Sequence, residues 1–118
     1  MLFQDRHVDL VAKAGLPWRR SFVLRARDQR ILTPDAITAV VVDDAIVESG
    51  DSPWGTTEMT TSVTDRVVTL TLSEIQTAVL TPNVPLDFEV LVLADGDEGR
   101  ALHGTLTVLP RYADRPEV

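Results

Sequence analysis

The chain has 118 residues, a hydrophobic fraction of 44% and a net charge of −7, which fits a single domain with a hydrophobic core. It contains no cysteine, which excludes a disulfide framework and a thiolate metal site, and no apolar stretch approaches the roughly 20 residues that cross a bilayer. The first residues lack the charged region and long apolar run of a signal peptide. We therefore expect a soluble, unprocessed protein that is made in a reducing cytoplasm and has no membrane partner.

The charge is unevenly distributed along the chain. Residues 1–35 carry seven basic and four acidic side chains, whereas residues 36–118 carry four basic and fourteen acidic ones. The overall acidity argues against nucleic acid as a partner, because nucleic-acid-binding proteins usually present a net basic face. The basic and acidic segments could form complementary patches that bring copies or partners together. Alternatively, folding mixes the two segments, so that their opposite charges cancel.

The first half of the chain predicts short strands separated by turn residues. An apolar run at residues 8–12 ends at Gly15 and Pro17. In the next strand, side chains alternate between a buried face and an arginine-bearing solvent face. The buried set is Trp18, Phe22, Leu24 and Ala26. Residues 36–43 form a β-branched strand, and residues 57–63 a threonine-rich edge strand. The acidic pair Asp43 and Asp44 ends its strand, where charge keeps an edge from pairing with other sheets.

The second half predicts a strand, a helical turn and a β-hairpin. Residues 66–72 alternate, with Val68, Leu70 and Leu72 on the inner face. Ser73 caps a short helix with Gln76 at the capping-box position, and the apolar residues of that helix should close one end of the core. That set is Ile75, Val79 and Leu80. Residues 86–94 are apolar on both faces, which indicates a central, doubly covered strand, and Asp95-Gly96 turns the chain into residues 101–109.

These elements predict an all-β fold. We expect an antiparallel, immunoglobulin-like β-sandwich of about seven strands with one short helical turn. Residues 1–110 should form this domain, and residues 111–118 an extended tail. The Cys…Trp…Cys pattern of antibody domains is absent, so only the architecture is implied.

No sequence pattern indicates an enzyme or a cofactor. The two histidines, His7 and His103, are far apart in the chain and are expected to be surface residues rather than metal ligands or catalytic groups. No nucleophile elbow, phosphate-binding glycine-rich loop or metalloprotease helix motif is present. The acidic loop at residues 95–98 has alternating oxygen ligands but no distal bidentate glutamate, so a solvated hairpin tip is favoured over a cation site.

Five residues are candidates for a protein–protein interface. Trp54 lies in the loop at residues 48–55, where Gly, Pro, Ser and Asp are concentrated, and an aromatic side chain in such a loop either anchors a partner or folds back on the sandwich. Trp18 either caps the core or contributes to an interface with its basic neighbours Arg19 and Arg20. Tyr112, in the tail, completes the set.

Four ordered segments carry a resemblance to a known family. They are V-D-L-V-A-K-A-G-L-P-W-R-R-S-F-V-L-R-A-R-D, I-L-T-P-D-A-I-T-A-V-V-V, V-T-L-T-L-S-E-I-Q-T-A-V-L and G-T-L-T-V-L-P. In this order they resemble small bacteriophage virion proteins, near the immunoglobulin-like N-terminal domain of phage baseplate upper proteins and minor tail proteins. Two turns depart from the family pattern, at Leu32-Thr33-Pro34 and at Asn83-Val84-Pro85-Leu86.

The resemblance implies a structural virion component without catalytic residues. Its expected partners are other virion proteins and copies of itself, and its expected location is the virion, in the tail, baseplate or fibre region. A capsid decoration or head-fibre protein is the nearest alternative. A carbohydrate-binding module that uses Trp54 and the acidic loop is an alternative from another functional class.

Overall fold

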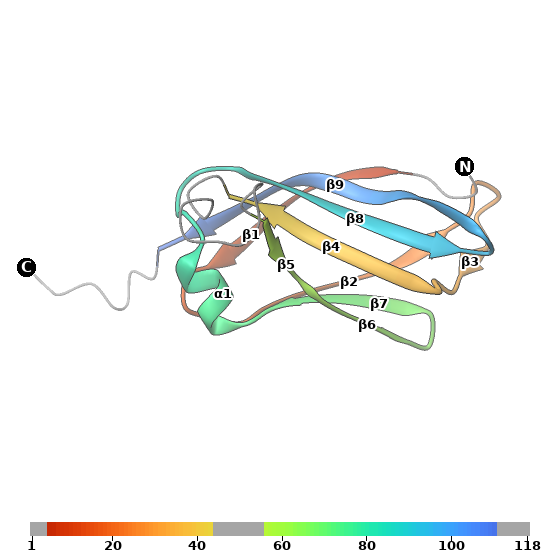
Figure 1. Ribbon diagram of the computed structural model, residues 1–118, viewed down its shortest axis with the longest axis horizontal. Coiled ribbons are helices and arrows are strands. Elements are labelled where there is room, and N and C mark those ends of the chain that lie inside the picture. Colours follow the sequence, from red (N-terminus) through yellow and green to blue (C-terminus); the bar gives the residue numbers. More distant parts are fainter. Residues whose placement is uncertain (1–4, 44–55, 111–118) are drawn as a thin grey trace, which may run out of the picture.

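The computed structural model describes residues 5–43 and 56–110, which form two β-sheets that face each other across one core (Figure 1). The predicted all-β sandwich with one short helix is confirmed. The predicted loop with Trp54, the second acidic residue Asp44 and the predicted tail with Tyr112 lie outside the described residues.

Five strands form the larger sheet and four form the smaller one. In sheet order, the larger sheet contains β1 (Arg6–Lys13), β9 (Asp97–Leu109), β8 (Leu86–Ala94), β4 (Ala36–Val42) and β5 (Thr56–Glu58). The smaller sheet contains β3 (Ile31–Leu32), β2 (Trp18–Arg25), β7 (Val67–Leu72) and β6 (Thr60–Thr64). The described residues therefore form nine strands rather than about seven.

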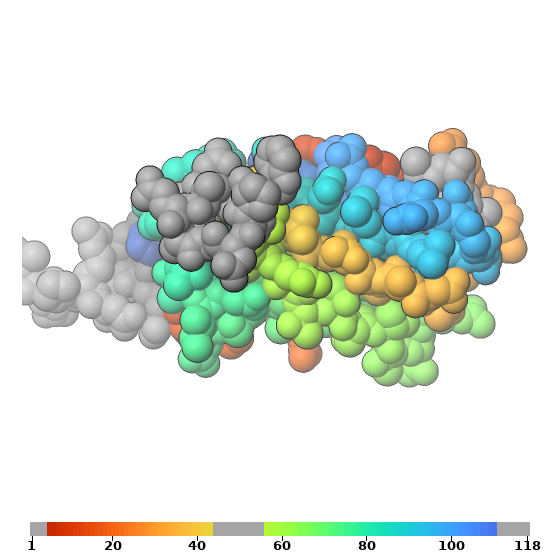
Figure 2. Space-filling view, viewed as in Figure 1, coloured from red at the N-terminus to blue at the C-terminus, as the bar shows by residue number. Residues whose placement is uncertain are grey.

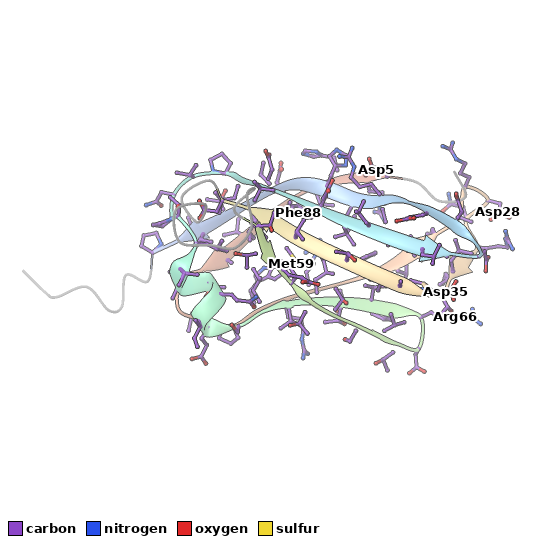
Figure 3. All side chains as sticks on the ribbon, in the orientation of Figure 1. Asp5, Asp28, Asp35, Met59, Arg66 and Phe88 are labelled. Carbon is purple, nitrogen blue, oxygen red and sulfur yellow. The ribbon has the colours of Figure 1, made fainter. Side chains whose placement is uncertain are left out.

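The extra strands arise partly because the threonine-rich segment changes sheets. β5 pairs with β4 in the larger sheet, whereas β6 pairs with β7 in the smaller one. Met59 lies at the crossing: its side chain is buried, and its backbone N–H donates to the carbonyl oxygen of Ala39 at 2.8 Å. Met59 is labelled in Figure 3, between the two layers. The single edge strand predicted for residues 57–63 is thus two edge strands joined by a buried corner.

One strand pair departs from the predicted antiparallel arrangement. β1 runs parallel to β9, from the pair Arg6–Leu102 to the pair Lys13–Leu109. All other strand pairs among the described residues are antiparallel. The parallel pair joins the two ends of the described chain, so it depends on contacts between residues that are distant in sequence.

Period-two burial generates the core, as the sequence predicted. The buried face of β7 is Val68, Leu70 and Leu72, and each of these side chains is fully buried. β8 buries every second residue from Leu86 to Ala94, including Phe88, which is labelled in Figure 3. On the other face of β8, however, Leu91 and Leu93 are 36% and 37% exposed, so the prediction of a doubly covered strand is wrong. Their apolar side chains lie on the outer face of the larger sheet.

Helix α1 (Glu74–Val79) has the predicted cap but a different buried face. The Ser73 hydroxyl accepts from the N–H of Gln76 at 3.1 Å, and the Gln76 side chain accepts from the N–H of Ser73 at 2.8 Å. Of the three apolar residues expected to close the core, only Leu80 is buried; Ile75 and Val79 are 77% and 60% exposed. Thr77 is the buried residue of α1 instead, and its hydroxyl donates to the carbonyl oxygen of Leu16 at 2.9 Å.

Asp43 does not protect a sheet edge, which corrects the role predicted for it. Its side chain is buried, and its carboxylate accepts from the Thr81 backbone N–H at 2.7 Å and from the Thr81 hydroxyl at 3.0 Å. Asp43 thereby ties the end of β4 to the segment that follows α1. A buried carboxylate is tolerated in such a position because hydrogen bonds to it replace those with water.

Candidate interaction surfaces

The candidate residues Trp18, Arg19 and Arg20 are consecutive on β2, so their side chains point to alternate faces of the strand. Trp18 is half-buried, is paired with Leu72 across the strands, and packs against the core. Arg19 and Arg20 are exposed and form no hydrogen bond or ion pair with any residue in ranges 5–43 and 56–110. The two arginines are therefore available to external groups, whereas much of the Trp18 side chain is committed to the core.

The two lateral sides of the sandwich differ. On the near side in Figure 1, the β5–β6 crossing joins the two sheets, and in Figure 2 the atoms of β4 lie next to those of the β5–β6 segment. On the far side, β1 is the edge of the larger sheet, and β2 is covered by β3 only at Leu24 and Arg25. Residues 18–23 of β2 are therefore an open sheet edge, because β7 pairs with their opposite side.

A groove runs between the open edges of β1 and β2. It consists of two adjoining cavities of ≈ 290 Å³ and ≈ 230 Å³, which share Arg6, Phe22, Val23 and Leu102 in their walls. Arg25 lines the first cavity and Arg20 the second. We call this feature the arginine groove and define it by Arg6, Arg20, Phe22 and Arg25.

The charges of the arginine groove are only weakly compensated by the chain itself. Among the described residues, Arg6 and Arg20 have no ion-pair or hydrogen-bond partner. Arg25 donates from Nη1 to the backbone oxygen of Gln29 at 3.1 Å, which does not neutralise it. Guanidinium groups bind carboxylates in a planar, two-pronged geometry, so the groove has the chemistry to bind an acidic surface.

A polar network lies on the outer face of the larger sheet and brings together the two histidines. The parallel register places His7 beside His103, with ring centroids 5.1 Å apart and planes at 75°. The Asp5 carboxylate lies 2.7 Å from His103 Nδ1 and accepts from Arg100 Nε at 2.9 Å. The sequence contained no local signal for this network, because Asp5 and His103 are 98 positions apart.

The network lowers the pKa values of two carboxyl groups. For Asp5, burial raises the pKa, but hydrogen bonds from His103 and Arg100 and the charge of Arg100 outweigh it, so the net direction is downward. For Asp9, the hydrogen bond that the Thr105 hydroxyl donates at 2.9 Å is the main cause of the lowered pKa, with a further contribution from His7. Both groups are thus held as carboxylates on this face.

The lowered pKa of Asp5 predicts a pH dependence of stability. The stabilisation from the carboxylate is fully present above the ordinary, unfolded pKa of 3.8 and is lost as the pH falls through the lower folded pKa. We expect Asp5→Asn to reduce the free energy of unfolding at pH 7, with the difference from the natural protein shrinking as the pH falls through the lowered folded pKa of Asp5. Urea unfolding between pH 2.5 and pH 7 measures it. Asp35→Asn, at an exposed site, is the matched control; a constant Asp5→Asn difference down to pH 2.5 would contradict the assignment.

A depression of ≈ 430 Å³ lies beside this network. It is lined by the carboxylates Asp87 and Glu89, by Arg100 and by both histidines, over the backbone of Gly104. Arg100 is paired with Asp5 at 2.8 Å, whereas its distance to Glu89 is 3.9 Å. Asp87 has no hydrogen-bond or ion-pair partner among the described residues. We call this feature the acidic depression and define it by Asp87 and Glu89.

The acidic hairpin tip is an ordinary two-residue turn. Asp95 and Gly96 both have positive φ, 50° and 77°, as a type I′ turn between β8 and β9 requires. Within residues 5–43 and 56–110, no group of three His, Asp or Glu side chains is arranged to hold a metal ion. In the same residues, no helix has the length and apolar character to cross a membrane.

No protein-family model matches the chain, and no curated protein is significantly similar to it in sequence.

Proposed function

We propose that the protein is a structural component of a bacteriophage particle, in the tail, baseplate or fibre region, and that it acts by protein–protein assembly. The phage setting rests on the resemblance of four ordered segments to small virion proteins, from residues 8–28 through residues 104–110. Their order is compatible with the immunoglobulin-like sandwich that the chain forms.

The observation that carries an assembly role is the arginine groove. Arg6 and Arg20 are exposed at the rim of a concave, partly apolar surface and have no partner within the described residues. Half-buried Phe22 and Val23 lie between these charges. Protein interfaces combine apolar contact area with arginine, so this combination suits a protein partner with acidic groups.

The test is the presence of the protein in purified particles. We expect mass spectrometry of density-gradient-purified virions to detect the 13.0 kDa chain in many copies per particle. An antibody labelled with gold should then mark the tail, baseplate or fibres in electron micrographs. Labelling of the capsid would replace the tail assignment by head decoration. Absence of the protein from particles, in a lysate that contains it, would refute the virion role.

A further inference from the structure

Resting on the proposed assembly role, we propose that the arginine groove of one copy binds the acidic depression of a second copy of the same chain. The groove carries Arg6, Arg20 and Arg25, and the depression carries Asp87 and Glu89. Each copy therefore offers both halves of one complementary contact. The partner is a second copy, because the chain itself displays the acidic surface that the groove requires.

The two surfaces cannot neutralise each other within one copy. β1 lies between them: Arg6 belongs to the wall of the groove, and the neighbouring residue His7 belongs to the wall of the depression. Successive side chains of a strand point to opposite faces of its sheet. The groove opens between the sheets, whereas the depression lies on the outer face of the larger sheet. Only a second molecule can bring their charges together.

Unused binding capacity remains on both sides of the contact. Arg6 and Arg20 have no partner among the described residues, and neither does Asp87. Arg100, the cation inside the depression, is already paired with Asp5 at 2.8 Å. An incoming guanidinium would thus meet two carboxylates that the chain itself leaves free or weakly paired, and guanidinium and carboxylate groups form strong, charge-assisted hydrogen bonds.

Apolar surface accompanies the charges, as a stable contact requires. Phe22 and Val8 are half-buried beside the groove. On the outer face of the larger sheet, Val11 is 58% exposed and Leu91 is 36% exposed. Charged groups set the orientation of a protein contact, while the burial of such apolar groups supplies most of its affinity.

The net charge of −7 does not prevent this association at physiological salt. At 0.15 M salt the Debye length is about 8 Å, so repulsion between the whole molecules is largely screened. Oppositely charged groups in direct contact lie closer together than this length, so their attraction persists at 0.15 M salt, although it falls as the salt concentration rises. Local complementarity therefore outweighs the overall repulsion, and raising the salt concentration should weaken the contact.

The experiment measures the mass of the full chain in solution by light scattering and analytical ultracentrifugation over a range of concentrations. We expect a concentration-dependent rise from 13.0 kDa at 0.15 M salt and a shift towards monomer at 0.5 M salt. The groove variant Arg6→Glu/Arg20→Glu and the depression variant Asp87→Lys/Glu89→Lys should each weaken self-association by about tenfold or more. Arg66→Glu, at the exposed tip of the β6–β7 hairpin labelled in Figure 3, is the matched control and should associate normally.

The decisive arm mixes the two charge-reversed variants. Copies of either variant alone repel each other at the proposed contact. In the mixture, the unchanged acidic depression of the groove variant can bind the unchanged arginine groove of the depression variant. The two charge-reversed surfaces are also complementary to each other. We expect the mixture to form a complex that neither variant forms alone, with both variants retaining the circular dichroism spectrum of the natural protein. A natural protein that stays at 13.0 kDa, or an association insensitive to both reversals, would overturn the proposed contact. Detection of the chain in virions would still support the virion role, so the two proposals fail separately.

Discussion

Replacing Gly104 by alanine is expected to lower the free energy of unfolding by about 2–5 kcal/mol, through backbone strain and steric overlap together. Gly104 has a φ of 150°, which side-chain-bearing residues rarely adopt. A Cβ atom at this position would overlap the carbonyl oxygen of Val8 and lie 2.8 Å from its carbonyl carbon. Val8 is the residue paired with Gly104 in the parallel β1–β9 register, so the added methyl group forces the two strands apart.

Hydrogen exchange localises this effect. We expect the amides of β1 to lose protection in Gly104→Ala, while the amides between β2 and β7 keep theirs until global unfolding. Gly96→Ala is the matched control: Gly96 also has a positive φ, 77°, but an added Cβ there meets nothing within 4 Å. It should therefore cost only about 1 kcal/mol, from backbone strain alone. Equal destabilisation by the two substitutions would contradict the role of Gly104 in strand packing.

Replacing Asp43 by alanine is expected to reduce stability by about 2–4 kcal/mol, because it leaves partly buried donors without an acceptor. The lost interactions include the 2.7 Å bond from the Thr81 N–H and the 3.0 Å bond from the Thr81 hydroxyl. The backbone N–H cannot be removed, and its desolvation is then uncompensated. Urea unfolding monitored by tryptophan fluorescence measures the change.

Two further variants separate this mechanism from a simple loss of charge. Thr81→Val removes the hydroxyl but keeps the N–H bond to Asp43, so we expect a loss of about 1 kcal/mol. Asp35→Asn removes a carboxylate at an exposed site and should be nearly neutral. A loss for Asp43→Ala that is no larger than that for Thr81→Val would show that the buried carboxylate is not what holds the segment after α1.

The sequence predicted those features that depend on neighbouring residues. The bounds predicted for the central strand, residues 86–94, match β8 because its alternation continues without interruption to the Asp95-Gly96 turn. The capping box at Ser73 was equally predictable, because both of its hydrogen bonds join residues three positions apart. The buried face of α1 was predicted incorrectly because hydrophobicity alone favoured Ile75 and Val79 over Thr77. The Thr77 hydroxyl, however, donates to the carbonyl oxygen of Leu16 at 2.9 Å, a contact between distant segments.

The interaction surfaces were predictable only in part. The alternation of β2 correctly indicated that Arg25 is exposed, and the basic pair beside Trp18 indicated an interface candidate. That Arg20 shares a groove with Arg6 could not be inferred, because it depends on which strand edges remain open after the sheets form. The acidic depression was not predicted, because Asp87 and Glu89 belong to a strand that was expected to be covered on both faces.

The order of apolar and polar residues by itself determined that this chain forms strands, which face of most strands is buried, and where the helix and hairpin begin. These properties follow from side-chain alternation and from hydrogen bonds over a few residues, which act before the chain is folded. Tertiary structure alone decided the parallel β1–β9 pair, the pairing of Asp5 with Arg100 across 95 positions, and the groove between β1 and β2. These features depend on which distant segments pack together. That packing is determined by the free energy of the whole core, to which any short stretch of sequence contributes only a part.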